Sequence, residues 1–200
     1  MFAVTLSMVP EVLGGKCLGL TLITISPGVS LALRVDAMGL FFGLCASLLW
    51  IFTSFYSIGY MRGLSGHKQT RYFAFFAVCL SATMGIAFSA NLLSFIIFYE
   101  ILTIATYPLV IHKETPEAIS AGRKYLAYLL SGGVLLIAAI AFTYLSAGTI
   151  DFRPGGFLTM EMGAQNLMIL FLLFMVGFGV KSALMPFHSW LPTAMIAPTP

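Results

Sequence analysis

Two ionisable side chains stand inside long apolar runs of this sequence. Glu100 lies in the run Asn91–Ile111, and Lys181 lies in the run Asn166–Phe187. A run of that length can cross a bilayer as a helix. A charge at its centre costs roughly 2.5–3.5 kcal/mol on insertion scales unless it is neutralised or paired. One acid and one base in separate spans therefore predict a pathway for protons or cations.

A buried acid and base can move protons because each changes the charge state that the other prefers. A carboxylate near a lysine favours the charged amine, and separating the two releases the proton of the lysine. Thr103 and Tyr107 share a helix face with Glu100, which makes that face a candidate water-lined stripe. Other residues near these spans have hydroxyl or titratable side chains and are candidate relay groups: Tyr99, Thr106, His112, Lys124, Tyr125, Tyr128 and Ser182.

Lys124 and His188 are weaker candidates for the same pathway. Lys124 follows Arg123 near the end of a span, where a snorkelling anchor explains it at least as well as a relay. His188 precedes Trp190 outside the apolar run, so packing at the membrane interface is its default role. His67 and Glu114 have the pattern of ordinary loop residues.

Two alternatives to ion translocation stay open at this point. The Glu100–Lys181 pair could be a structural ion pair that only fixes helix packing, in a subunit without transport activity. A small-solute carrier is the third interpretation, and it ranks last because no binding pocket can be recognised in the sequence.

The composition is that of an integral membrane protein. Of the 200 residues, 60% are hydrophobic and only 8% are charged, and the mean hydropathy is +0.99. Soluble domains carry about 25% charged residues. The net charge of +3 sits in short loops, which indicates membrane topology rather than nucleic-acid binding. The opening residues lack the basic region of a signal peptide.

The sequence gives no sign of a cofactor or metal site. Cys17, Cys45 and Cys79 are scattered without metal-ligand spacing and are expected to fill small apolar gaps. No flavin, nicotinamide, haem or iron–sulfur motif is present. We therefore expect no cofactor in this chain, and any redox chemistry would belong to partner subunits.

The predicted fold class is an all-α integral membrane protein with an external β-hairpin-like loop. Phe2–Leu13 is too short to span, and Lys16–Val35 alternates and breaks at residues 26–28, which favours a hairpin or an extended loop. Asp36 then has the position of a helix N-cap. Five spans are predicted: Ala37–Tyr60, Tyr72–Ser89, Leu92–Ile111, Tyr125–Ala147 and Leu167–Phe187. The expected divisions are residues 1–36, the bundle 37–187 and a cytoplasmic-side segment 188–200.

Local residues add detail to these spans. Pro108 should kink the third span near its end, and Gly132 with Gly133 should allow close helix contact or a bend. Gly177, Gly179 and Pro186 predict an irregular helix near Lys181. Aromatic residues stand partly at membrane-belt positions: Trp50, Tyr56, Tyr60, Tyr72 and Trp190.

The basic residues predict the orientation in the membrane. Six of them fall on one side, namely Arg62, Lys68, Arg71, Lys113, Arg123 and Lys124, and three fall on the other, namely Lys16, Arg34 and Arg153. The side with the excess is expected to be cytoplasmic. The hairpin would then lie outside and the His188 segment inside.

Several motifs resemble one family of membrane proteins. GVKSALMPF at Gly179–Phe187, followed by HSWLPTAMIAPTP at His188–Pro200, is similar to the signature of the antiporter-like subunits. These occur in respiratory complex I, in Mrp-type cation/proton antiporters and in membrane-bound hydrogenases. FYEI at Phe98–Ile101, YSIGYMRG at Tyr56–Gly63 and RYFAFF at Arg71–Phe76 also resemble that family, so the match runs along nearly the whole chain.

The resemblance implies roles for particular residues. Glu100 would be the paired carboxylate, Lys181 the central channel lysine on a broken helix, and Lys124 a basic residue on the span after the glutamate. The family fold has about fourteen helices in two inverted repeats of about five helices each. This chain would hold roughly the first repeat. Residues 188–200 would lead into a missing helix, so the sequence is expected to be a piece of a longer protein.

The resulting functional expectation is an ion-translocating subunit of a multisubunit membrane assembly. It would move protons, with Na⁺ as the alternative cation, and would have no redox site of its own. The assembly could be an NADH–quinone oxidoreductase, a hydrogenase or an Mrp antiporter. FYEI followed by ILTIATYPLV, with a TPEA loop at Thr115–Ala118, favours the antiporter and hydrogenase branch. The expected partners are other membrane subunits and the lipid bilayer, in the plasma membrane of a prokaryote.

Overall fold

The computed structural model describes residues 1–26, 28–63, 67–159 and 162–198. Pro27 and Pro200, which the sequence analysis mentions, lie outside these residues. The elements in chain order are α1 (Phe2–Leu13), β1 (Leu18–Ser26), β2 (Val29–Val35), α2 (Ala37–Gly63), α3 (Gln69–Ala87), α4 (Leu92–Val110), α5 (Pro116–Ala147), α6 (Ala164–Lys181), the 3₁₀ turn η2 (Phe187–Ser189) and α7 (Trp190–Ala194).

Within the described residues, five helices are long and apolar enough to cross a membrane, namely α2, α3, α4, α5 and α6. The predicted fold class, with its five spans and its hairpin, is confirmed. Two span boundaries were wrong. The sixth helix, α6, ends at Lys181 rather than Phe187, and α5 begins at Pro116 rather than Tyr125.

The early start of α5 has a local cause. Thr115 is extended, and its side-chain oxygen accepts a hydrogen bond from the backbone N–H of Ala118 at 3.2 Å. Pro116 occupies the first helical turn, where its missing N–H costs nothing. The TPEA segment is thus the capped start of a helix and not a loop, and Arg123 with Lys124 stands inside that helix.

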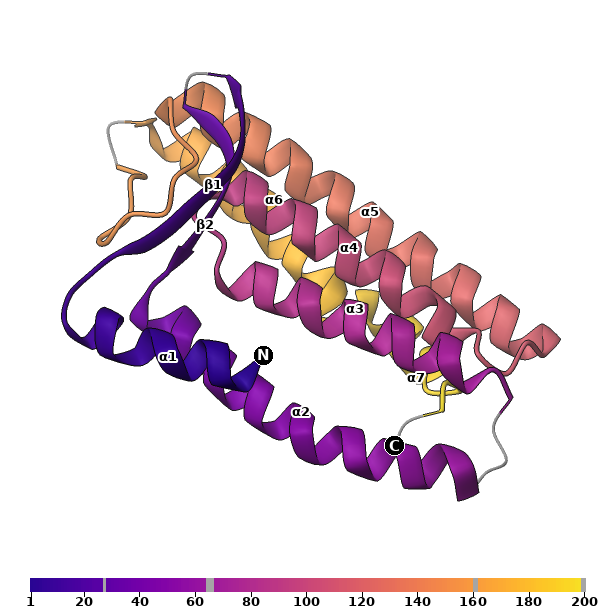
Figure 1. Cartoon of the computed structure of the whole chain (residues 1–200). Coiled ribbons are helices and arrows are strands. Elements are labelled where there is room, and N and C mark those ends of the chain that lie inside the picture. Colours follow the sequence, from indigo (N-terminus) through magenta and orange to yellow (C-terminus); the bar gives the residue numbers. More distant parts are fainter. Residues whose placement is uncertain (27, 64–66, 160–161, 199–200) are drawn as a thin grey trace.

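The helices α3, α4, α5 and α6 lie side by side along the bundle, while α2 runs along one side of it with α1 packed on α2 (Figure 1). The α1–α2 contact includes a buried hydrogen bond of 3.2 Å between the hydroxyls of Thr5 and Ser47. A core cluster around Ile96, Tyr99 and Leu136 joins α4 to α5 and to the aromatic side chains of α6. Pro108 lies inside α4, two residues before its end.

The hairpin closes one end of the bundle. β1 and β2 pair antiparallel, from Leu18 opposite Val35 to Ser26 opposite Val29, with two irregularities in register. The turn between α3 and α4 pairs with this hairpin, because the N–H of Ala90 donates to the carbonyl of Ala32 at 3.0 Å and the N–H of Arg34 donates to that of Phe88 at 2.7 Å. Asp36 caps α2 as predicted, with Oδ1 accepting from the N–H of Gly39 at 2.7 Å.

Polar contacts tie the connections at the other end. Glu114, between α4 and α5, accepts hydrogen bonds from Lys68 at 2.6 and 2.7 Å and also from Arg71, at the start of α3. α7 lies at this same end (Figure 1). The six basic residues that the sequence groups together therefore have a common end in the fold, while the cytoplasmic placement of that end stays a prediction.

Candidate functional site

The site is organised by the place where α6 stops. Lys181 is the last residue of α6, and Ala183 takes a left-handed φ of 54° before the chain resumes in η2 and α7. A helix end leaves carbonyls without intrahelical partners. The indole N–H of Trp190 donates to one of them, the carbonyl of Val180, at 2.8 Å. Irregular structure near Lys181 was predicted from its glycines and Pro186, and the helix does break there.

The ammonium of Lys181 is held by neutral groups of α4. It donates to the carbonyl oxygen of Tyr99 at 3.1 Å and to the hydroxyl of Thr103 at 3.0 Å. It also lies 3.4 Å from the centroid of the Tyr99 ring, within the range of a cation–π interaction. The Thr103 hydroxyl itself donates to the Tyr99 carbonyl at 3.0 Å. Lys181 thus sits in a small polar site inside an otherwise apolar bundle.

The carboxylate of Glu100 points to a different neighbour. It lies against Gly133 of α5, where an added Cβ would overlap the carboxylate oxygen. Both carboxylate oxygens are buried and have no hydrogen-bond partner among the described residues. Gly133 is therefore the residue that gives Glu100 room between α4 and α5, in agreement with the close helix contact that the glycine pair predicts.

Glu100 and Lys181 do not form a direct ion pair. Three ion pairs occur within the described residues, Lys16–Glu11, Lys68–Glu114 and Arg71–Glu114, and each has at least one partner with an exposed side chain. Consecutive helical residues point about 100° apart. α4 therefore presents Glu100 to α5 and the neighbouring Tyr99 carbonyl to α6. The Glu100 carboxylate thus lies against α5, and the Lys181 ammonium lies against the neighbouring Tyr99 carbonyl of α4, without direct contact between the two charges.

Gly132 allows a close contact between α6 and α5. An added Cβ there would lie 3.0 Å from Cβ of Val180 and 3.1 Å from the carbonyl oxygen of Gly177. An added Cβ would thus be tight against α6 at Gly132 and would overlap Glu100 of α4 at Gly133. The Lys181 end of α6 and the Glu100 turn of α4 consequently contact successive residues of α5.

The stripe of Glu100, Thr103 and Tyr107 packs on protein. Tyr107 would meet a Cβ at Gly122 of α5, and Thr103 has no exposed surface. The hydroxyl of Tyr125 donates to the carbonyl of Thr103 at 3.3 Å. Glu100 and Tyr107 thus lie against glycines of α5, whereas the hydroxyl of Thr103 receives the ammonium of Lys181 from α6.

Lys124 and His188 lie away from Glu100. Lys124 donates to the hydroxyl of Thr193 on α7 at 3.3 Å, and Ser189 donates to the hydroxyl of Tyr128 at 2.9 Å. These hydrogen bonds join α5 to the segment that follows the break. His188 is exposed on that segment.

Two aromatic residues that the sequence placed in the membrane belt are core residues instead. Tyr72 is 2% exposed and Trp190 is 8% exposed. The Trp190 ring stacks edge-on against Tyr125 at 5.6 Å, beside its bond to Val180. Position near a span end suggested an interfacial role, but where α6 breaks the indole N–H finds a buried acceptor in the Val180 carbonyl.

A second group of titratable residues lies between α3 and the α4–α5 connection. The imidazoles of His67 and His112 stack with centroids 5.1 Å apart, and His112 is 3% exposed. Burial lowers the pKa of His112, and the positive charges of Arg71 and His67 lower it further. The hydrogen bonds from Lys68 and Arg71 lower the pKa of Glu114 to about 2. Sequence spacing gave no signal for this cluster, because its members come from separate loops.

Comparison with known proteins places these features in a family. Residues 89–200 match the family described as NADH:quinone oxidoreductase/Mrp antiporter, TM. The chain is 32% identical over 164 residues to "Hydrogenase-4 component B" of Escherichia coli (strain K12), a match that covers 82% of this chain and 24% of that protein. It is 27% identical over 199 residues to "Putative antiporter subunit mnhA2" of Staphylococcus haemolyticus, covering 98% of this chain and 25% of that protein.

A plant relative is similar to the same degree. The chain is 28% identical over 176 residues to "NADH-ubiquinone oxidoreductase chain 4" of Marchantia polymorpha, covering 86% of this chain and 34% of that protein. The chain thus spans about a quarter to a third of the length of the curated relatives named here. Their names describe a hydrogenase component, an antiporter subunit and an NADH-ubiquinone oxidoreductase chain.

Two solved membrane complexes have the same fold. The Mrp complex from Dietzia sp. DQ12-45-1b matches with a TM-score of 0.75 and 18% identity over 96% of this chain and 36% of that chain. The archaeal membrane-bound sulfane sulfur reductase matches with a TM-score of 0.84 and 20% identity over 98% of this chain and 40% of that chain. The helical bundle with its hairpin is therefore an arrangement that occurs in multisubunit membrane complexes.

Proposed function

Because this chain belongs to the NADH:quinone oxidoreductase/Mrp antiporter membrane family, we propose that it translocates protons, with Lys181 as the group that takes up and releases them. The observation that carries the proposal is the site of Lys181 at the end of α6. Its amine is held inside the bundle by a carbonyl, a hydroxyl and an aromatic ring.

Neutral partners suit a group that must change its charge. A lysine in a tight buried ion pair loses its proton only by leaving a carboxylate without a partner, which costs several kcal/mol. At Lys181, the amine keeps donors for the Tyr99 carbonyl and the Thr103 hydroxyl after the proton has left. The site can therefore hold the charged and the neutral amine in nearly the same geometry.

The end of α6 supports the charged form of Lys181. Partial negative charge collects on the free carbonyls at a helix C-terminus and stabilises a nearby cation. Because α6 ends at Lys181, the residue that carries the amine is also the residue at the negative end of this helix. In an unbroken helix it would lie farther along the chain.

Glu100 acts on Lys181 at short range but without contact. Its negative charge favours the protonated amine, and loss of that charge favours proton release. No hydrogen bond joins the two groups, so the charge of Glu100 acts on Lys181 through space. Glu100 therefore sets the proton affinity of the carrier, and Lys181 carries the proton.

The segment after the break supplies a route towards the end that holds the six basic residues. Lys124 and Tyr128 of α5 face Thr193 and Ser189 through hydrogen bonds. Hydroxyl and amine groups of this kind can pass protons when water connects them. In this proposal Lys124 is a relay residue, and His188 is an exposed group at the mouth of the route.

The chemistry of the site favours protons over Na⁺. A sodium site needs several carbonyl or carboxylate oxygens around a cavity. Here the available carbonyl and hydroxyl already receive a lysine ammonium, whose positive charge repels a second cation. We place the chain with other membrane subunits of its assembly in the prokaryotic inner membrane.

The structural alternative assigns Glu100 and Lys181 to packing alone. A charge pair that fixes helix packing has to be formed, and these two groups are not in contact. A buried carboxylate without a donor contributes no favourable contact that would explain its presence as packing. The unpaired state of Glu100 therefore favours the functional interpretation.

The test uses the full-length protein in its native assembly. Lys181→Ala should nearly abolish proton flux per assembled complex, Glu100→Gln should reduce it, and Glu100→Asp should be milder because it keeps the charge. Native gels measure the amount of complex, and a pH-sensitive dye in vesicles measures the flux. Lys113→Ala is the matched control, since Lys113 is exposed on the connection between α4 and α5. Normal flux per assembled complex in Lys181→Ala would end this proposal.

A further inference from the structure

Two cavities share a wall at the end of the bundle that carries the hairpin. One has a volume of about 350 Å³ and the other of about 500 Å³. Arg34, Asp36 and Phe152 line both of them. One cavity is mostly apolar and the other is basic, and the residues that line them do not belong to the Lys181 site.

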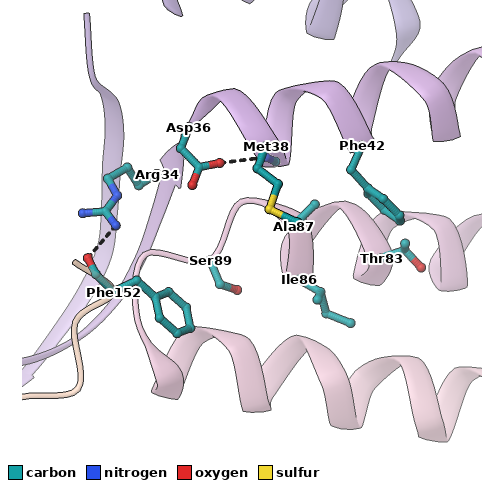
Figure 2. A pocket seen from close by; sticks show the side chains of 10 residues that line it. Arg34, Asp36, Met38, Phe42, Thr83, Ile86, Ala87, Ser89 and Phe152 are labelled. Carbon is teal, nitrogen blue, oxygen red and sulfur yellow. Dashed lines mark hydrogen bonds between the residues drawn. The ribbon is translucent and has the colours of Figure 1, made fainter. Parts of the chain in front are cut away.

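The smaller cavity is mostly apolar and lies between α2 and α3. Met38 of α2 lies beside Ala87 of α3, and Phe42 of α2 lies opposite Thr83 of α3, as Figure 2 shows. Its mouth is polar, because Arg34 and Asp36 stand where the hairpin leads into α2. The volume is at the lower end of the range of about 300–1,000 Å³ for small-molecule sites. It fits a short apolar segment rather than a complete lipid.

The larger cavity is basic. Lys16, Arg34 and Arg153 line it, against Asp36 as the acidic residue. The carboxylate of Asp36 is already engaged in capping α2, since it accepts the N–H of Gly39. Lys16 also pairs with the exposed Glu11 at 2.6 Å. Positive charge still exceeds negative charge on the walls, so the cavity suits an anion.

Arg34 connects the basic cavity to the apolar one. Its Nη2 donates to the carbonyl of Phe152 at 2.7 Å, which fixes the guanidinium in the shared wall (Figure 2). A guanidinium has five N–H donors in a planar fork that matches a phosphate. One anchoring bond therefore leaves several donors for a ligand in this wall.

The depth of these groups matches the layers of a bilayer. Arg34 and Asp36 immediately precede the candidate span α2, and Ala87 ends the candidate span α3. Phe42 lies about 8 Å deeper than the first residue of α2, at 1.5 Å per residue. The charged residues thus stand at headgroup level, with the apolar walls directly beneath them at the level of acyl chains.

We propose that this double cavity binds a phospholipid with an anionic headgroup. Its phosphate contacts Arg34, its headgroup extends toward Lys16 and Arg153, and the beginning of one acyl chain enters the apolar cavity. The remainder of that chain follows the lipid-facing surface of α2, where Phe41 is 70% exposed and Phe55 is 75% exposed. Basic pockets beside membrane helices are suited to anionic headgroups.

The test uses the full-length protein in its assembly, in nanodiscs of phosphatidylcholine. The probe is phosphatidylglycerol with a photoactivatable acyl chain, and cross-linked peptides are identified by mass spectrometry. We expect cross-links to the peptides of Phe42 and Ile86. Arg34→Gln should lower this cross-linking by about tenfold, the effect of one lost charge-assisted hydrogen bond. Arg62→Gln, at the far end of α2 and exposed, is the matched control and should leave it unchanged.

A second variant fills the cavity without touching the core. Met38 is 82% exposed and faces the cavity, so Met38→Trp should block the acyl chain while the protein still folds. A phosphatidylethanolamine probe should label the same peptides several-fold less. Equal labelling by both lipids, unchanged labelling in Arg34→Gln, or no labelling because a neighbouring subunit covers the face would each overturn the proposal.

Discussion

Lys181 and Tyr99 contact each other through two different parts of the tyrosine. The ammonium donates to the Tyr99 carbonyl at 3.1 Å and lies 3.4 Å from the centroid of the Tyr99 ring. The backbone contact holds the amine whether or not it is charged, whereas the ring attracts only the charged form. One residue thus combines a charge-independent and a charge-dependent contact to the proposed carrier.

The ring of Tyr99 should therefore matter more than its hydroxyl. The hydroxyl has no hydrogen-bond partner among the described residues, so Tyr99→Phe should transport protons like the unmodified protein. Tyr99→Leu removes a cation–π contact worth about 0.5–2 kcal/mol, which is roughly twofold to thirtyfold in the population of charged Lys181. Proton flux per assembled complex is the measurement. Equal losses in Tyr99→Phe and Tyr99→Leu would show that the ring face has no role.

Gly133 should not tolerate a side chain. Gly133→Ala places a methyl group where the Glu100 carboxylate lies, so the carboxylate must move or α4 and α5 must separate. Overpacking of this kind typically costs about 1–3 kcal/mol. We expect a lower thermal midpoint in detergent and reduced flux per complex. Gly59→Ala is the control, because nothing lies within 4 Å of its added Cβ, and it should be neutral or slightly stabilising.

The contact between Glu114 and the start of α3 should weaken in acid, when the carboxylate of Glu114 becomes protonated. The pKa of Glu114 is about 2 in the folded protein against an ordinary value of 4.5. Its contribution to stability is therefore complete above pH 4.5 and is lost as the pH falls towards 2. Glu114→Gln should remove this dependence, measured by hydrogen exchange at residues 112–115. Glu11→Gln, which changes an exposed pair at the other end of the fold, should retain it.

Cysteine labelling can determine the orientation in the membrane. The predicted topology places residue 159 outside and residue 113 in the cytoplasm. Thr159 is preferable to Gly156 as a labelling site, because Gly156 adopts a φ of 79° that favours glycine. In a background without Cys17, Cys45 and Cys79, an impermeant maleimide should label Thr159→Cys in intact cells and Lys113→Cys only after permeabilisation. The opposite pattern would reverse the topology.

The sequence could predict which residues matter in the bundle, because a charge in an apolar run is conspicuous. Glu100 and Lys181 were identified in this way, and the glycines and Pro186 indicated the irregular segment that follows. The directions in which the two charges point could not be predicted. Spacing along one helix gives the angle between residues of that helix, but not the rotation of the helix against its neighbours. Gly133 on α5 decides where Glu100 can lie.

Errors at the helix ends have a related cause. Basic residues inside α5 resembled a loop, and the start of that helix depended on a hydrogen bond that the side chain of Thr115 accepts from the backbone N–H of Ala118. Trp190 resembled an interfacial aromatic residue until the break in α6 gave its indole a carbonyl to bind. Hydropathy records which segments are apolar, whereas these boundaries depend on individual polar groups that need a partner.

The adjacent glycines of α5 have a mechanical consequence. Gly132 bears directly on Val180, next to Lys181, and Gly133 bears directly on Glu100. Neither position has a side chain whose rotation could absorb a shift of the neighbouring helix. A small displacement of the α6 end would therefore move the turn of α5 at Gly132 and Gly133, and the Glu100 carboxylate packs against that same turn. The positions of Lys181 and Glu100, which are not in contact, are therefore mechanically coupled through Gly132 and Gly133.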